Sequence, residues 1–195
     1  MNRQIKKHLI RAFVAITFPP TVQAQINQVI NELQTTLMGY NLSWVKPKNF
    51  HITLSFLGEI TTPQCSTILH NIYPILHTTS AFTLNFSYLS LFPHPESPIA
   101  IALIPSPNSA LASLANSIEH IVPHDAIRHE HREFKPHITL VRIKHKVYPE
   151  NLSEILEHIS LPKIEYRVQN IHFLSSKPTA AGSHYSPIAT FSLNG

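Results

Sequence analysis

The chain has 195 residues, of which 43% are hydrophobic and 13% are charged. This length suits one domain, or one domain built from two similar halves, and the apolar content can fill a substantial core, which excludes an intrinsically disordered protein. The formal net charge of +4 is a mild excess that suits an anionic partner. The single cysteine, Cys65, excludes an internal disulfide and a cysteine-rich metal site.

The start of the chain does not resemble a membrane anchor or a signal peptide. A basic segment, residues 1–7, is followed by a short apolar stretch, residues 9–18, which Arg11 interrupts. A membrane span needs about 20 apolar residues, and the stretch lacks the pattern of a secretory signal. We therefore expect a cytoplasmic protein, monomeric and without membrane association.

Apolar periodicity predicts an irregular alternation of strands and helices. In chain order we expect a strand, a helix, a strand, a helix and two strands at 8–16, 20–37, 50–57, 62–74, 81–91 and 99–104. In the second half of the chain the same periodicity predicts a helix, a strand, a helix and two strands at 111–121, 136–143, 152–159, 164–174 and 188–193. Gly58 is expected to end its strand, and Pro74 to end or kink its helix. Several neighbouring strands are close enough to pair antiparallel, which favours the α+β class.

One tetrapeptide occurs twice. His51-Ile52-Thr53-Leu54 recurs as His137-Ile138-Thr139-Leu140, once in each half of the chain. Each copy lies on a predicted strand and follows a basic segment that contains proline, residues 46–50 and 132–136. Side chains alternate between the faces of a strand, so the histidine and threonine of each copy share one face. If a pseudo-two-fold axis relates the halves, both polar pairs converge on one groove.

This residue set suits cleavage of a cyclic phosphodiester. The reaction needs a base that takes a proton from water and an acid that protonates the departing ribose oxygen, and imidazole serves as either near neutral pH. His51 and His137 would carry the protons, and Thr53 and Thr139 would donate hydrogen bonds to the phosphate oxygens. The alternative is that these are half-buried strand histidines and threonines with a structural role only.

Cations and further histidines gather near the motifs. Two of the fifteen Lys and Arg residues lie at 46–48 and six at 128–146, which is either a phosphate-attracting surface or a solvated basic loop. The loop at 124–137 contains four histidines, including His129 and His131. No third ligand has a recognisable spacing, so we expect neither a metal nor another cofactor.

The sequence resembles the 2H phosphoesterases, and among them the RNA 2′,3′-cyclic phosphodiesterases also called 2′-5′ RNA ligases. The resemblance covers nearly the whole chain. Beyond the two motifs it rests on Arg11-Ala12-Phe13-Val14-Ala15-Ile16, Trp44-Val45-Lys46-Pro47, Phe56-Leu57-Gly58-Glu59, Phe134-Lys135-Pro136, Val141-Arg142, Ser176, Gly182 and Tyr185. It implies a single domain over residues 1–195, made of two pseudo-symmetric α/β lobes whose antiparallel sheets face a central groove, with one motif in each lobe.

The resemblance also implies roles for individual residues. The family converts a terminal 2′,3′-cyclic phosphate of RNA or a nucleotide to a 2′-phosphate without a metal. By analogy His51 is the proton donor to the leaving 3′ oxygen, His137 is the proton acceptor that activates water, and Arg142 is a phosphate or substrate contact. On a regular strand Arg142 has the opposite parity to His137, so it reaches the groove only if the strand ends or bulges.

Aromatic residues are candidates for stacking on a base or ribose, as RNA ends are often held in this way. The candidates are Phe13, Trp44, Phe92 and Tyr185, and ordinary core packing is the alternative for each. Residues 1–7 precede the point where many family members begin and are either a disordered tail or an extra RNA contact. Two alternative functions are joining of RNA ends through a 2′-5′ linkage by the reverse reaction, and a non-catalytic module that binds RNA or nucleotides.

Overall fold

The computed structural model describes residues 9–122, 133–144, 148–180 and 182–195. The first half of this part contains β1 (Leu9–Thr17), α1 (Pro20–Thr36), β2 (Leu42–Trp44), the 3₁₀ helix η1 (Pro47–Asn49), β3 (His51–Thr61), α2 (Thr62–Thr78), β4 (Phe82–Phe92) and β5 (Ala100–Pro105). The second half contains α3 (Ser109–Ile121), β6 (Ile138–Ile143), α4 (Leu152–Glu157), β7 (Glu165–Val168), β8 (Asn170–Thr179) and β9 (Gly182–Ser192).

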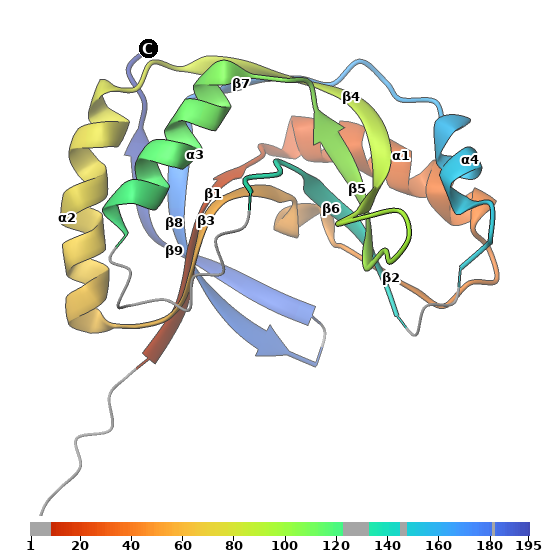
Figure 1. Ribbon diagram of the computed structural model, residues 1–195, viewed down its shortest axis with the longest axis horizontal. Coiled ribbons are helices and arrows are strands. Elements are labelled where there is room, and N and C mark those ends of the chain that lie inside the picture. The colour runs from red at the N-terminus through yellow and green to blue at the C-terminus, as the bar shows by residue number, and fades with distance from the viewer. Residues whose placement is uncertain (1–8, 123–132, 145–147, 181) are drawn as a thin grey trace, which may run out of the picture.

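The strands form one sheet in which every neighbouring pair is antiparallel. Its order is β7-β4-β5-β6-β3-β1-β8-β9, and β2 pairs with β6 beside this path. The sheet curves strongly (Figure 1). Its two halves meet between β3 and β6, where only Ile52 and Ile138 are paired. These are the second residues of the two motifs, so the motifs lie side by side at the centre of the sheet.

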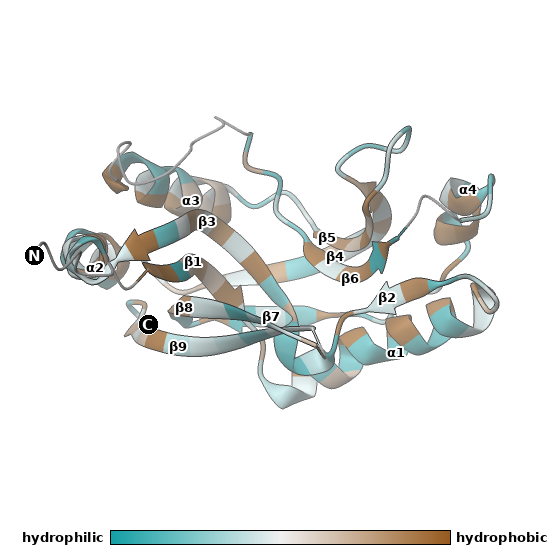
Figure 2. Ribbon diagram, turned by 90° about the horizontal axis from the view of Figure 1, so that it is seen from below, coloured by the Kyte–Doolittle hydropathy of each residue, from teal (hydrophilic) through white to brown (hydrophobic). Residues whose placement is uncertain are grey.

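Helices cover both halves of the sheet and close its large hydrophobic core, while Phe13, Ala15 and Leu174 form a small separate cluster. In both views α1 lies along the half made of β4, β5 and β6, whereas α2 and α3 lie along β1, β3, β8 and β9 (Figures 1 and 2). The apolar residues of α1 recur at helical spacing and are buried: Val22, Ile26, Val29, Ile30 and Leu33. Burial of each such side chain contributes roughly 1.5–3 kcal/mol. No helix in the described ranges is long and apolar enough to cross a membrane.

Gly58 does not end its strand, as the sequence predicted. β3 continues to Thr61 and pairs Gly58 with Ala12, then Phe56 with Phe13, so that Leu57 has no partner. This extra residue is a β-bulge, and Gly58 has a φ of +63°, a conformation that favours glycine. The glycine therefore allows a bulge within the strand.

Pro74 does not end its helix either. α2 continues to Thr78 with Pro74 inside it on the exposed side, while Ile72 and Leu76 on either side of it are buried. A capping box between Thr61 and Gln64 stabilises the start of this helix.

The end of the chain has more strand than the sequence predicted. The strand expected at 164–174 is divided near Gln169 into β7 and β8, and β8 continues to Thr179. β9 begins at Gly182, several residues before the predicted 188. The added part is a polar hairpin with few buried side chains, which leaves almost no apolar alternation to detect.

Candidate active site

Matched bulges set the polar face of each motif. In β6, Thr139 pairs with Ala102 and Val141 with Ile101, so Leu140 has no partner. The extra residue reverses the alternation, and Leu140 and Val141 are both buried. Arg142 therefore shares a face with Thr139 and extends into the groove. A bulge is the condition under which the strand pattern predicted that Arg142 would reach the groove.

β3 has the same bulge at the same place in its motif. Thr53 pairs with Ala15 and Ser55 with Val14, so Leu54 has no partner. Phe56 consequently shares a face with Thr53, as Arg142 does with Thr139 in the second motif. The two motifs thus have one backbone geometry, but at equivalent positions one presents an aromatic ring and the other a cation.

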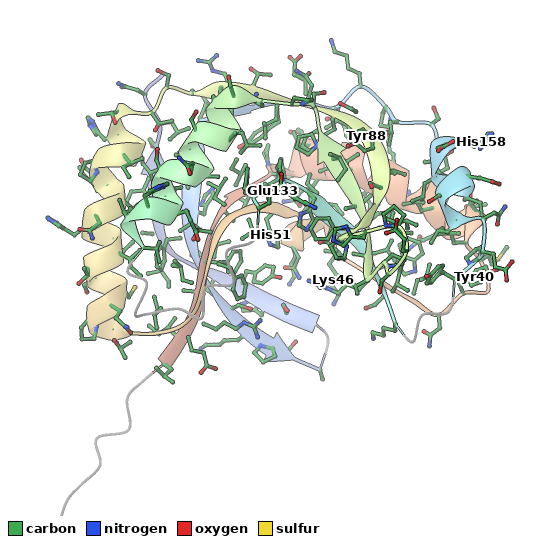
Figure 3. The ribbon with its side chains drawn as sticks, in the orientation of Figure 1. Tyr40, Lys46, His51, Tyr88, Glu133 and His158 are labelled. Atoms are coloured by element: carbon green, nitrogen blue, oxygen red, sulfur yellow. The ribbon has the colours of Figure 1, made fainter. Side chains whose placement is uncertain are left out.

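The two polar faces line a common groove of about 400 Å³. Its lining comes from both motifs, from β1 and from the β8–β9 hairpin: Arg11, Phe13, His51, Thr53, Phe56, Phe92, Ile99, Ala100, His137, Thr139, Arg142, Ser176, Pro178, Ser183 and Tyr185. Figure 3 shows His51 near the middle of the molecule, close to the central strands and the hairpin. No carboxylate belongs to this lining as far as the described residues go.

The two histidines have matching hydrogen bonds. His51 Nδ1 lies 2.7 Å from the carbonyl oxygen of Asn49, and His137 Nδ1 lies 2.8 Å from that of Lys135. A carbonyl only accepts, so Nδ1 carries the proton in both rings. In the neutral ring Nε2 is then the unprotonated nitrogen, which can accept a proton.

Burial disfavours the protonated, positively charged form of both imidazoles. Desolvation lowers the pKa of His51 and of His137 below the ordinary value of 6.5, and the carbonyl hydrogen bonds oppose this shift in part. Arg142 lowers the pKa of both rings further, and His137 also lowers that of His51. Both rings are therefore largely neutral at pH 7 in the free protein, and an anion bound between them would favour protonation.

Aromatic rings hold the histidines in place. Phe13 and Tyr185 each contact His51 with ring centroids 5.1 Å apart, and Phe92 stacks on His137 at 3.8 Å. Phe13 is only 2% exposed, so its ring packs against His51 and Tyr185 and has little free face for a base. Phe92 and Tyr185 also line the groove.

Trp44, predicted as a stacking residue, does not line the groove. It pairs with Val141, which is completely buried, while its neighbour Ser43 pairs with Arg142. Directly paired residues point to the same face of a sheet. Trp44 therefore packs against the hydrophobic core, on the face away from Arg142.

Arg11 and Phe56 are among the groove residues that were not predicted from the sequence. The guanidinium carbon of Arg11 lies 5.3 Å from the ring centroid of Phe56, and Phe56 is 48% exposed. Two signals could have identified them. Arg11 is a cation within an apolar strand, and Phe56 follows His51 by five residues, as Arg142 follows His137.

The described residues contain no group of three or more His, Cys, Asp and Glu side chains that could hold a metal ion. The histidine-rich segment with His124, His129 and His131 lies outside the described residues. The same is true of residues 1–7.

The chain matches a family model described as LigT like phosphoesterase twice, over residues 16–102 and 101–185. It is 28% identical over 176 residues to an RNA 2′,3′-cyclic phosphodiesterase of Thermotoga maritima, covering 90% of this chain and 91% of the relative. It is 27% identical over 190 residues to an enzyme of the same name from Aquifex aeolicus, covering 96% and 99%.

Solved structures share the fold. Escherichia coli LigT in complex with 3′-AMP superposes with a TM-score of 0.77 at 22% identity, covering 96% of this chain and all of the other. The Thermus thermophilus protein TT0787 superposes with a TM-score of 0.76 at 24% identity, covering 95% and 99%. The predicted α+β class, with antiparallel strands and a duplicated architecture, is confirmed.

Proposed function

Because the chain belongs to the LigT-like phosphoesterase family, we propose that it hydrolyses 2′,3′-cyclic phosphate ends of RNA or nucleotides to 2′-phosphates, with two histidines and without a metal. The observation that carries this proposal is the pair of His-x-Thr motifs on one groove, each histidine held through Nδ1 by a backbone carbonyl. The names of the Thermotoga and Aquifex relatives support the substrate class.

The proposed cycle moves one proton at each histidine. His137 Nε2 takes a proton from water as the water oxygen forms a bond to phosphorus. The bond from phosphorus to the ribose 3′ oxygen breaks, and protonated His51 gives that oxygen its Nε2 proton. The product keeps the 2′ bond and is a 2′-phosphate. A lowered pKa makes protonated His51 a stronger acid, which suits a poor leaving group.

The remaining polar groups act on the phosphate charge. The hydroxyls of Thr53 and Thr139 donate to the two non-bridging oxygens, where negative charge is concentrated. Arg142 contributes a permanent positive charge and up to two parallel hydrogen bonds. Its charge also opposes protonation of the histidines, so the phosphate anion both occupies the site and restores the proton affinity of the acid.

The direct test uses purified protein and a 2′,3′-cyclic nucleotide, with 2′- and 3′-phosphate products separated by chromatography. We expect the 2′-phosphate alone, and turnover reduced about 10²- to 10⁴-fold in His51→Ala and in His137→Ala. Exclusive formation of the 3′-phosphate would contradict the assignment of the leaving oxygen.

Chelation tests the metal-free mechanism separately. Activity should persist in excess EDTA, because the two imidazoles supply both proton transfers and Arg142 supplies the cation. Complete loss of turnover that a divalent ion restores would contradict this mechanism. An added ion without prior chelation serves as the control for inhibition by the metal itself.

Two other functions predict different results in the same assay. A 2′-5′ end-joining enzyme would convert paired 2′,3′-cyclic and 5′-hydroxyl ends to a longer RNA, whereas hydrolysis should dominate in water unless both ends are held together. A binding module would retain the nucleotide without product. A phosphate-binding module would gain as much from Arg or Lys at the positions of His51 and His137.

We further infer that residues 1–195 form a single domain of two pseudo-symmetric lobes. The two family matches, one in each half, and the matched bulges at Leu54 and Leu140 support this inference. The lobes share a continuous sheet and core, so either half expressed alone should fail to fold cooperatively in a thermal melt.

A further inference from the structure

The groove contains a second cation that the proposed reaction does not use. Arg11 lies two residues before Phe13 on β1, and both side chains reach the groove. Phe13 contacts His51, whereas the Arg11 guanidinium lies over the ring of Phe56. A cation over an aromatic face is held at a fixed place without losing its charge.

This cation reaches the reacting centre only through two aromatic rings. The Arg11 guanidinium carbon lies 5.3 Å from the Phe56 ring centroid, the Phe56 ring lies 6.3 Å from that of Phe13, and the Phe13 ring lies 5.1 Å from that of His51. Arg142 lowers the pKa of both His51 and His137, and Arg11 is not among the charges that shift either ring. Arg142 is thus placed for the reacting phosphate, and Arg11 for a different group.

Arg11 also keeps its charge available. It makes no ion pair with any residue that the structure describes. Lys135, by contrast, forms an ion pair with Glu133. Glu59 lies opposite Arg11 in the β1–β3 register without forming such a pair. An exposed guanidinium with no carboxylate partner among the described residues, at the rim of a groove that suits a phosphate, suits a second anion.

We propose that Arg11, held by Phe56, forms a second phosphate subsite that binds the phosphodiester linking the terminal nucleotide to the rest of an RNA chain. The preferred substrate is then an oligoribonucleotide with a 2′,3′-cyclic end, not a free cyclic nucleotide. This inference rests on the proposed function and specifies its substrate. The group that Arg11 would bind is a phosphate on the 5′ side of the reacting nucleoside. Either an RNA chain or a simple 5′-phosphate could supply it.

The experiment compares three substrates: adenosine 2′,3′-cyclic phosphate, the same nucleotide with a 5′-phosphate, and a dinucleotide with a cyclic end. In Arg11→Gln we expect kcat/KM for the dinucleotide to fall about tenfold, with less than a twofold change for the unphosphorylated mononucleotide. The slope of log kcat/KM for the dinucleotide against log salt concentration should also become shallower by an amount that corresponds to about one phosphate contact. An equal loss on the 5′-phosphorylated mononucleotide would overturn the RNA-chain assignment in favour of a terminal phosphate.

Controls separate a local contact from general electrostatics and from damage to the fold. Arg167→Gln removes the same charge from an exposed position on β7, outside the groove, and should leave all three substrates unchanged. Phe56→Leu should reproduce part of the Arg11→Gln effect, because the guanidinium loses the ring that holds it. Thermal unfolding should match between Arg11→Gln and the parent protein. Equal losses on dinucleotide and mononucleotide, or the same selective loss in Arg167→Gln, would overturn the proposal.

Binding measurements test the Arg11 subsite independently of turnover. The dissociation constants of adenosine 2′-phosphate and of the dinucleotide with a 2′-phosphate end can be measured calorimetrically. Arg11→Gln should weaken only the dinucleotide, again about tenfold. If the parent protein binds both but hydrolyses neither substrate, the proposed function fails while the subsite stands. If the variant binds both ligands as the parent does, the subsite fails whatever the activity.

Discussion

His51 and His137 share a chemical setting that surface histidines lack. Each is fixed by a carbonyl two residues earlier, backed by aromatic rings and partly removed from water. These contacts hold one ring nitrogen and leave the other for proton transfer. The same burial lowers the pKa of both rings, so the site's protonation state depends on what is bound in the groove.

The pH dependence of kcat/KM follows from these shifts. The base must be neutral and the acid protonated, so the profile is bell-shaped. Both pKa values lie below 6.5 in the free protein, so kcat/KM should be greatest below pH 6.5 and fall about tenfold per pH unit above the pKa of the acid. A maximum above pH 7.5 would contradict the lowered pKa of the acid.

Arg142→Gln tests the effect of the Arg142 charge on the two histidine pKa values, measured in the same pH profile of kcat/KM. Removal of the guanidinium removes a charge that disfavours both imidazolium ions, so both limbs should move to higher pH. KM should rise more than kcat falls, because Arg142 carries no proton in the cycle. Arg167→Gln, which removes an arginine outside the groove, should leave the profile in place.

The division of roles between the histidines can be tested with a better leaving group. A nitrophenyl phosphodiester needs little help from an acid, so His51→Ala should regain much of its activity on this substrate, and His137→Ala should not. Equal rescue of both variants, or rescue of His137→Ala alone, would reverse or remove the assignment. It would leave the two-histidine mechanism intact.

At the scale of elements, the β8–β9 hairpin forms one side of the groove, and η1 is bonded to that hairpin. The Asn49 side chain donates from Nδ2 to the Ser183 carbonyl at 2.9 Å, while the Asn49 carbonyl accepts from His51. The pairing of β8 with β1 ends at Ser175, so the outer part of the hairpin is a two-stranded ribbon. Such a ribbon has marginal stability alone. Asn49 thus connects the hairpin to His51 in the first motif.

Asn49→Ala should loosen this side of the groove without unfolding the protein. We expect KM to rise several-fold with a smaller change in kcat, because the carbonyl that orients His51 remains. Hydrogen exchange should accelerate at the amides of the outer hairpin, and stay unchanged in α1. Ser192→Ala removes a hairpin hydrogen bond at the other end of β9 and serves as the matched control. Unchanged exchange in Asn49→Ala would show that Tyr185 packing alone holds the hairpin.

For the whole molecule, buried histidines connect stability to pH. Desolvation lowers the pKa of His51, His137 and His172, so in mildly acidic solution the unfolded chain binds more protons than the folded one. The stabilisation is complete above the unfolded pKa near 6.5 and is lost as the pH falls through the lowered values. The free energy of unfolding, measured with urea, should therefore decrease between pH 7 and pH 5.

His172 separates this effect from the active site, because it does not line the groove. His172→Asn should flatten the dependence of stability on pH and leave turnover near that of the parent protein. Asparagine can still hydrogen-bond the Thr190 hydroxyl that His172 contacts at 3.1 Å. A pH dependence equal to that of the parent would assign the acid lability to other groups.

The amino-acid sequence by itself determined the class of fold and the candidate residues of the site. The repeated His-x-Thr tetrapeptide identified four of the polar residues that line the groove, and local apolar periodicity predicted most strands and helices, because side-chain period and residue type act over a few neighbours. Only the tertiary structure decided to which face of the sheet several of these side chains point. The bulges at Leu54 and Leu140 turn Phe56 and Arg142 into the groove, and the pairing of Trp44 with Val141 turns that ring to the core. Bulges and pairing partners depend on the neighbouring strand, which lies far away in the sequence. The contact between Arg11 and Phe56 likewise depends on the pairing of β1 with β3.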